Sequence, residues 1–282
     1  MKRALFTSMV TSAAVIGIVS SGAVVTGRTA AQAPAAATPP AGPAPRMADG
    51  HPDLSGVWWP GRDLQIRPLG DPPPAASGAP APAAAAPRRQ TFASLYQPWA
   101  QEKARTLSDK DDPTLRCVPT AFGTLNVSLY DVGFVGQIIQ TPKFVIMLAE
   151  TFHGFRIVPI DGRPHRDDVA PSLRGDSIGR WEGDTLVVDR TNFSDANWMG
   201  AEGVVSFHSN ALHIVERYRR LDANTIEVDA IVEDPKVLTS PWNVPTQTLK
   251  LAPFDQIMEI ACSGVETAPL MEAASKQNYG KK

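Results

Sequence analysis

The sequence predicts a mainly β fold, which we expect to be an antiparallel barrel or curved sheet with one short N-terminal helix. Three observations support this prediction. Short segments that alternate apolar and polar residues follow one another from residue 136 onward, turns rich in Gly, Asp, Asn and Pro separate them, and a single segment has a helix-forming composition. This pattern is typical of antiparallel sheets that close or curl strongly.

The segment 179–189 is the clearest hairpin in the chain. Its sequence, GRWEGDTLVVD, places an acidic, glycine-centred turn between two strands. Because side chains alternate along a strand, one face of the second strand carries Thr185, Val187 and Asp189, and the other carries Leu186, Val188 and Arg190. We expect Trp181, in the first strand, to pack at one end of the barrel.

The remaining elements follow from the same kinds of signal. Pro98 suits the first turn of a helix over 99–107, which ends at the polar segment 109–113. Further strands are predicted at 136–140, 143–151, 156–160, 211–221, 225–233, 247–252 and 256–262. The last four of these strands form two hairpins that turn at 222–224 and 253–255.

The chain divides into a leader, a linker, one domain and a tail. Residues 1–33 have the pattern of a signal peptide, with two basic residues, an apolar stretch and a small-residue cleavage site, Ala31-Gln32-Ala33. An Ala/Pro-rich linker follows at 34–45, a single β-barrel domain at 46–267 and a C-terminal tail at 268–282. Within the domain, the Pro/Ala-rich stretch 71–87 predicts a disordered loop.

The signal peptide predicts a periplasmic or secreted protein. The alternative is a membrane anchor, but the apolar stretch is short and contains Ser and Gly. Cleavage would therefore leave no segment inserted in the membrane. It would also lower the basic count from 27 to 24 against 29 acidic residues, a net charge of −5. This acidic balance argues against nucleic acid as a partner.

Two cysteines, Cys117 and Cys262, lie in the predicted domain. In an oxidising compartment an even pair favours a disulfide, and a bond between these two would close most of the domain into one loop. Loops of that length gain about 4–5 kcal/mol in the chain-entropy description. Two separately buried thiols are the alternative. A catalytic cysteine is disfavoured because neither residue stands in a nucleophile motif.

Three longer motifs are distinctive: HPDLSGVW at 51–58, DGRPH at 161–165 and GRWEGDTLVVD at 179–189. In these motifs the chain resembles a family of largely uncharacterised secreted bacterial proteins, over about residues 46–266. The resemblance implies a periplasmic or secreted β-rich domain and no established reaction. The chain departs from the family pattern at Arg190, where a small residue is usual, and at Asn210, where an acid is usual.

A second and shorter likeness concerns the start of the fold. Gly56-Val57-Trp58 is similar to the Gly-x-Trp that opens the first strand of lipocalin-like, or calycin-type, barrels. Three residues are a weak match alone, but the antiparallel pattern that follows them agrees with it. The likeness implies a barrel that encloses a small, partly apolar molecule.

The turn 161–165 is the first place where chemistry is expected. Arg163 suits the binding of a carboxylate or phenolate, and His165 suits a general base or a metal ligand. The alternative is structural: Asp161 caps the turn, and Arg163 forms an ion pair.

The longest polar connection, 192–213, is the second place. It carries Asn192, Asp195, Trp198, His208 and His213, and functional residues concentrate on such loops. Trp198 suits closure over an aromatic ligand, and the two histidines with Asp195 suit acid–base chemistry. Their spacing matches no recognised metal signature. Structural histidines are the alternative.

Acids placed among apolar residues are the third feature. Glu216 shares a strand face with Ile214 and Tyr218, and Glu150 shares one with Ile146 and Leu148. If these faces line the barrel, a carboxylate there is costly unless it is protonated or paired. A protonated acid would suit proton transfer. The alternative is a buried ion pair with an arginine, for which the candidates are Arg156, Arg180 and Arg217.

Together these residues define the expected site. We expect catalytic roles for His165, His208, Asp195 and Glu216, and substrate contacts from Arg163, Trp198, Asn192, Glu150 and His213. No cofactor and no metal are expected, because nucleotide-loop, nucleophile-elbow, His-Glu-x-x-His and Cys-x-x-Cys motifs are missing from the sequence.

Two functions follow from this expected site. The first is a cofactor-independent lyase, isomerase or hydrolase that acts by proton transfer on a small apolar or aromatic molecule. The second is a carrier that binds such a molecule without chemistry. A structural role in the cell envelope, with the Pro/Ala segments as spacers, is a third hypothesis. The sequence does not indicate an oligomeric state.

Overall fold

Nine antiparallel strands form one sheet that curls into a nearly closed barrel, which confirms the predicted fold class. The computed structural model describes residues 42–61, 90–122, 135–150, 152, 154–200 and 205–258. All of them belong to one compact unit, Pro40–Lys282. The predicted signal peptide 1–33, most of the linker, the loop 71–87 and the tail 268–282 lie outside the described residues, as does Cys262. The disulfide therefore stays a prediction.

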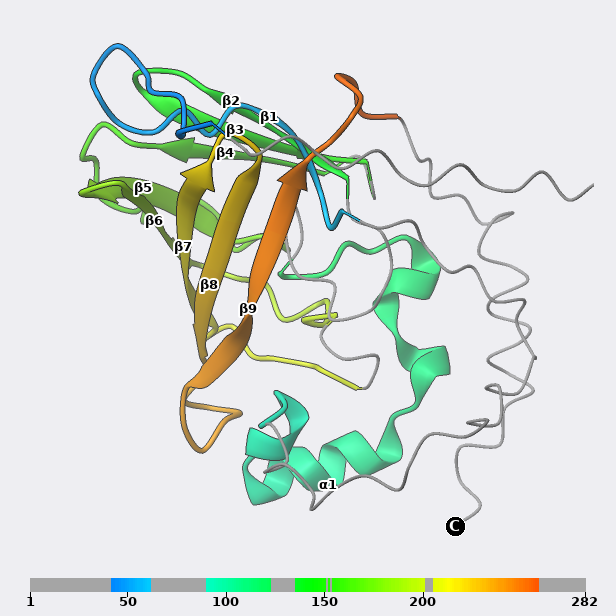
Figure 1. Cartoon of the computed structure of the whole chain (residues 1–282). Coiled ribbons are helices and arrows are strands. Elements are labelled where there is room, and N and C mark those ends of the chain that lie inside the picture. Colours follow the sequence, from blue (N-terminus) through cyan, green and yellow to red (C-terminus); the bar gives the residue numbers. More distant parts are fainter. Residues whose placement is uncertain are drawn as a thin grey trace, which may run out of the picture. The chain divides into compact units, whose positions relative to one another are not determined.

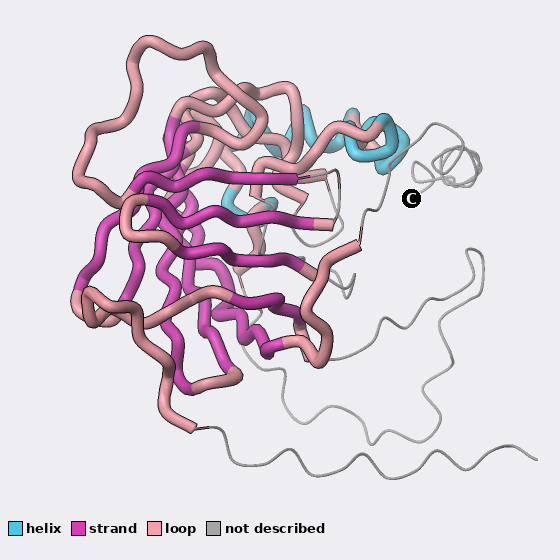
Figure 2. The backbone as a smooth tube through the Cα atoms, turned by 90° about the horizontal axis from the view of Figure 1, so that it is seen from above, coloured by secondary structure: helices cyan, strands magenta, loops and turns pink. Residues whose placement is uncertain are grey.

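The strand order is β4-β3-β2-β1-β9-β8-β7-β6-β5. Figure 1 shows β1–β4 crossing β7–β9 at a steep angle, and Figure 2 shows the strands curling around a shared interior. The strands are β1 Gly56–Trp59, β2 Gly136–Gln140, β3 Phe144–Ala149, β4 Gly154–Pro159, β5 Asp176–Glu182, β6 Thr185–Thr191, β7 His213–Asp222, β8 Thr225–Glu233 and β9 Trp242–Leu251.

Two hydrophobic clusters hold the sheet together. The barrel core lies between the curled strands and includes Trp58, Met147, Val158, Leu186 and Tyr218. The end core lies beyond it and packs the helix α1 (Pro98–Thr106), through Ala100, against the ends of β7–β9 and the segment around Trp198. Short 3₁₀ turns at Ala93–Leu95, Asp109–Asp111 and Pro113–Arg116 flank the helix. The predicted helix is thus confirmed.

The hairpin predicted at 179–189 is formed by β5 and β6. Glu182 pairs with Thr185 across a tight turn, in which Gly183 has a φ of 59° that favours glycine. Leu186 and Val188 point into the barrel core, as the alternation predicts. Trp181 packs against the same core and stacks on His51, with ring centroids 4.6 Å apart.

The predicted hairpin of 247–252 and 256–262 is wrong. β9 begins at Trp242, residues 256–258 form no strand, and 259–262 lie outside the described residues. The edge of β9 that this hairpin would occupy pairs instead with β1, where Trp58 lies opposite Leu251. Pro245, which has no N–H to donate, is tolerated within β9 because the register with β8 shifts there.

The interior face of β3 also differs from the face considered in the sequence. Val145, Met147 and Ala149 are buried toward the barrel, whereas Ile146 and Leu148 lie on the outer face. Both faces of this strand are apolar, so the alternation of hydrophobicity does not distinguish the inner face from the outer one.

The barrel is incomplete between β4 and β5, which are the two edges of the sheet. We call this boundary the seam. At one end the strands touch through side chains: a Cβ at Gly179 would lie 2.8 Å from Ile160 Cγ2 and 2.9 Å from Val158 Cγ1. At the other end the guanidinium of Arg174 fills the gap, 2.6 Å from where a Cβ of Gly154 would be. The seam is therefore closed by apolar contact at one end and occupied by a charged side chain at the other.

Because the two ends differ, substitution of the two glycines should have different effects on stability. Gly179→Ala should lower the free energy of unfolding by about 1–2 kcal/mol, because its methyl group overlaps packed core side chains. Gly154→Ala should lower it by less than about 0.5 kcal/mol, because the flexible end of Arg174 can move aside. Urea denaturation of both variants checks this. Equal losses would contradict the described seam.

Candidate ligand-binding site

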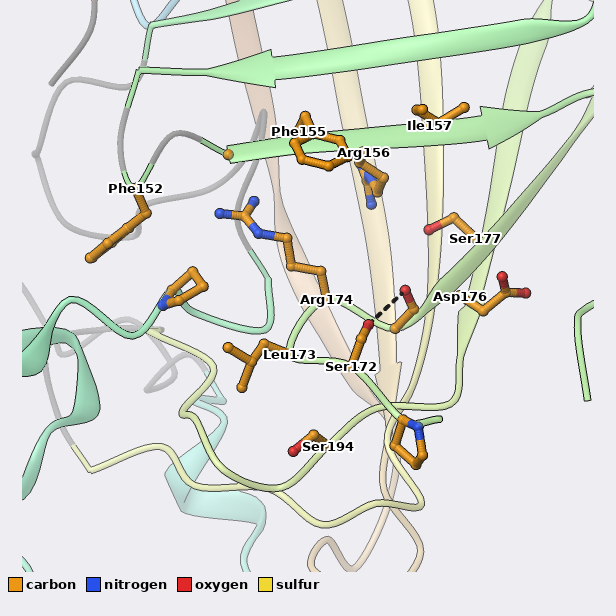
Figure 3. A pocket seen from close by; sticks show the side chains of 14 residues that line it. Phe152, Phe155, Arg156, Ile157, Ser172, Leu173, Arg174, Asp176, Ser177 and Ser194 are labelled. Atoms are coloured by element: carbon orange, nitrogen blue, oxygen red, sulfur yellow. Dashed lines mark hydrogen bonds between the residues drawn. The ribbon is translucent and has the colours of Figure 1, made fainter. Parts of the chain in front are cut away.

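A pocket of about 650 Å³ lies at the Arg174 end of the seam (Figure 3). This volume falls within the usual range for small-molecule sites, about 300–1,000 Å³. The lining residues come from β4, from the segment 171–177 and from neighbouring loops: Pro119, Phe152, Gly154, Phe155, Arg156, Ile157, Pro171, Ser172, Leu173, Arg174, Gly175, Asp176, Ser177 and Ser194. Apolar groups dominate this lining, and a few polar groups converge within it.

The segment 171–177, one wall of the pocket, is held tightly against the end of β6. Ser172 and the segment after β6 are joined through backbone hydrogen bonds, including Ser194 N to Ser172 O at 2.8 Å. Gly175 has a φ of 71°, and a Cβ there would lie 2.5 Å from Thr191 O. Asn192 donates from Nδ2 to Val169 O at 3.1 Å, just before this wall. The expected contact residue Asn192 thus supports the wall and does not line the pocket.

Behind the pocket lies a buried charge cluster, which we call the Glu216 cluster: Glu216, Arg156, Arg190 and Tyr218. Glu216 Oε2 lies 2.7 Å from Arg156 Nη1, and Glu216 Oε1 accepts a hydrogen bond from Arg190 Nη1 at 2.9 Å. Tyr218 Oη donates to Glu216 Oε2 at 3.0 Å. Glu216 and Arg190 are 0% exposed, so these groups are fully removed from water. The ion pair with Arg156 that the sequence offered as an alternative is present.

The Glu216 cluster joins the two sides of the seam. Arg156 belongs to β4, and its Nη2 donates to Tyr218 Oη at 2.9 Å. Arg190, on β6, donates from Nη2 to Arg174 O at 3.0 Å and to Ala121 O at 2.7 Å. Glu216 is therefore bonded both to β4 and, through Arg190, to the wall that leads into β5.

The charges within the cluster keep Glu216 ionised. Burial raises the pKa of Glu216, but the positive charges of Arg156 and Arg190 outweigh it and bring the pKa below its ordinary value. Burial raises the pKa of Tyr218, which stays neutral as a donor. A protonated Glu216 ready for proton transfer is not supported by this environment.

His208 makes structural contacts that reach the pocket indirectly. Its Nδ1 lies 2.9 Å from Ser209 O, and its Nε2 lies 2.9 Å from Asn197 Oδ1. Asn197 in turn donates to Pro119 O at 2.7 Å and to Leu173 O at 2.9 Å, and both of those residues line the pocket. Burial lowers the pKa of His208. His208 and Asn197 therefore position two parts of the pocket lining.

His165 and His213 lie on the outer face of β5–β8, in a row with carboxylates. His165 Nδ1 lies 2.7 Å from Asp176 Oδ2, and its Nε2 lies 3.0 Å from Asp189 Oδ1. His213 Nε2 lies 3.1 Å from the same Asp189 oxygen, and its Nδ1 lies 3.0 Å from Glu233 Oε2. Asp189 faces outward between Val188 and Arg190, which point inward, so this row is separated from the Glu216 cluster by the wall of the barrel.

The other expected residues have separate surroundings. Arg163 is exposed and forms a bidentate ion pair with Asp161, as the structural alternative stated. Trp198 is buried in the end core. Asp195 is exposed on its loop, and Glu150 accepts a hydrogen bond from Met258 N at 2.7 Å.

None of the nine expected site residues lines the pocket at the seam. Glu216, Asn192 and His165 each contact a residue that lines the pocket, namely Arg156, Ser172 and Asp176. His208 reaches the lining through Asn197, and the other five residues lie elsewhere. The residues that sequence reasoning missed are Arg174 and Ser177, while Arg156 was named only as an ion-pair partner. Both residues lie shortly before the GRWEGDTLVVD motif at 179–189, which is the only sequence signal near them.

In the described parts of the chain, no group of three or more His, Cys, Asp or Glu side chains is arranged to hold a metal ion. The same residues contain no helix with the length and apolar character needed to cross a membrane. No family model, no curated protein and no solved structure matches the chain. The resemblance to a family of secreted bacterial proteins therefore stays a prediction.

The buried contacts of the Glu216 cluster predict a large loss of stability when Glu216 is replaced. Glu216→Gln should lower the free energy of unfolding by about 3–5 kcal/mol, because it leaves two buried guanidinium groups without their carboxylate. Glu182→Gln is the matched control, since Glu182 pairs with Arg180 and Arg217 on the surface, and it should cost less than about 1 kcal/mol. Urea denaturation measures both, and similar losses would contradict the role of Glu216.

The outer histidine row makes a prediction about pH. Burial lowers the pKa of His213, but its hydrogen bond to Glu233 and the charge of Asp189 outweigh this effect, so the pKa is raised. The resulting stabilisation is complete below the unfolded pKa of about 6.5 and is lost as pH rises through the folded value. His213→Gln should therefore destabilise the protein more at pH 5.5 than at pH 9, as measured by urea denaturation. A deficit that grows toward pH 9 would contradict this.

Proposed function

We propose that the protein is an exported binding protein that holds one small, partly apolar molecule in the pocket at the seam. The single observation that carries this proposal is the pocket itself, where the barrel wall is interrupted and apolar groups surround converging polar ones. Phe155 and Ile157 are 64% and 50% exposed at its rim, so a ligand would cover apolar surface that now faces water. Export rests on the signal-peptide pattern of residues 1–33.

Binding has more support than proton-transfer catalysis. A general base has to come within about 3 Å of the proton it removes, or act through one water. His165 and His213 make their contacts on the outer face, and His208 is engaged by Ser209 and Asn197. Glu216 is held as an ionised partner of two arginines. Asp176 lines the pocket, but its carboxylate is hydrogen-bonded to His165 and points away from Arg156 (Figure 3). Among the described residues, the expected histidines and Glu216 therefore place no acid–base pair inside this pocket.

The binding proposal is tested with a neutral aromatic probe. 2-Acetylnaphthalene should bind the full chain with one-to-one stoichiometry in isothermal titration calorimetry. Phe155→Ser should weaken its affinity by about tenfold, because the ring loses an aromatic and apolar contact. Phe254→Ser is the matched control, since Phe254 is 42% exposed, packs edge-on to Trp59 and does not line the pocket.

Two results would contradict the proposal. The first is an absence of saturable binding to the unmodified protein both of this probe and of its carboxylate analogue, 2-naphthoate. The second is an equal loss of affinity in both variants, which would indicate non-specific adsorption to exposed aromatic side chains. Thermal unfolding of each variant shows whether a lost affinity reflects a damaged fold.

A further inference from the structure

Two buried polar groups at the pocket have no hydrogen-bond partner within the described structure: Arg156 Nε and Ser177 Oγ. Arg156 is 5% exposed and Ser177 is 6% exposed, and both line the pocket. A buried donor without a partner is costly, and such groups in folded proteins are nearly always satisfied by protein, water or ligand. Because both groups line one pocket, we infer that an acceptor from outside the chain receives their hydrogen bonds.

The charge around these two groups is positive. Arg156 and Arg190 share the single carboxylate of Glu216, and Tyr218 is neutral, so the Glu216 cluster carries an excess positive charge. Arg174 brings a further guanidinium to the same pocket. Burial and the nearby charge of Arg156 lower the pKa of Arg174 to about 10, which means that the two cations repel each other. An anion placed beside them would relieve this repulsion.

The carboxylate that lies nearest to these groups along the chain is already engaged. Asp176 accepts hydrogen bonds from the His165 ring at 2.7 Å and from Arg166 N at 3.2 Å. Figure 3 shows its carboxylate pointing away from Arg156, whereas Ser177 and Arg174 are directed toward the Arg156 side of the pocket. Asp176 therefore does not accept a hydrogen bond from Arg156 Nε or Ser177 Oγ.

We propose that the pocket binds the carboxylate of a small apolar or aromatic acid, with Arg156 Nε, Ser177 Oγ and Arg174 as its donors. This inference rests on the proposed function and names the ligand class for the same site. A carboxylate only accepts hydrogen bonds, and its two oxygens suit donors that arrive from both strands of the seam. The apolar body of the acid would lie against Phe155, Ile157 and Leu173, which line the same pocket.

The test compares two probes of nearly identical shape and different charge. 2-Naphthoate carries a carboxylate where 2-acetylnaphthalene carries a neutral methyl ketone. In isothermal titration calorimetry at pH 7, the unmodified protein should bind 2-naphthoate at least about tenfold more tightly, because hydrogen bonds to a charged group are the stronger ones. Inorganic phosphate at millimolar concentration should not displace 2-naphthoate, since it lacks the apolar body.

Substitutions then test whether Arg174 and Ser177 cause the tighter binding of 2-naphthoate. Arg174→Gln and Ser177→Ala should each lower the affinity for 2-naphthoate by about tenfold. The affinity for 2-acetylnaphthalene should change by less than about twofold. Arg180→Gln, on the exposed outer face of β5, removes the same charge as Arg174→Gln and should leave both affinities unchanged. Ser177→Ala removes a hydroxyl that has no partner, so its thermal unfolding should match that of the unmodified protein.

The outcomes separate the inference from the function on which it rests. Three results would overturn the carboxylate site and leave the binding function standing. They are equal affinity for both probes, displacement of 2-naphthoate by phosphate, and an equal loss of affinity for both probes in Arg174→Gln. Binding of neither probe would overturn the function itself. A charge-dependent loss confined to Arg174→Gln and Ser177→Ala, with Arg180→Gln unchanged, supports the site.

Discussion

The bonds made by Glu216 replace the strand pairing that the barrel lacks. β4 and β5 are the two edges of the sheet, and their backbones form no ladder with each other. Glu216, buried on β7, contacts Arg156 of β4 directly and reaches the backbone of Arg174 through Arg190. A buried carboxylate is unfavourable unless it is paired. The side-chain network is therefore compatible with the interior only because both arginines converge on this one acid.

The pocket follows from the way in which the seam is bridged. Apolar contact of Gly179 with Val158 closes one end, where a side chain on the glycine would not fit. At the other end the two edge strands are joined by long charged side chains, which do not fill the gap as apolar side chains do at the first end. The remaining space is the pocket. The same network thus stabilises the barrel and supplies the polar groups of the pocket. Arg190 is part of this bridge.

Much of the sheet could be predicted from the sequence, and the site could not. The hairpin 179–189 and the strand 225–233 were predicted closely, because strict alternation and short turns identify them. Alternation was uninformative in β3, where both faces are apolar, and Pro245 obscured the start of β9. The pocket depends on which two strands remain unpaired, and this is a property of the whole topology. Local sequence patterns indicate polar residues on loops, but they do not indicate which strands form the seam. Only Glu216, through its expected arginine partner, connected the sequence to the site.

A crystal structure of the protein with 2-naphthoate would show directly whether a carboxylate accepts hydrogen bonds from Arg156 Nε and Ser177 Oγ at the seam. We expect one carboxylate oxygen within hydrogen-bond distance of Arg156 Nε, about 3 Å, and the other within that distance of Ser177 Oγ. The naphthalene ring should lie against Phe155. A ligand bound only on the outer face of the sheet, or bound in the pocket with its carboxylate turned toward solvent, would show that these donors do not form a carboxylate site.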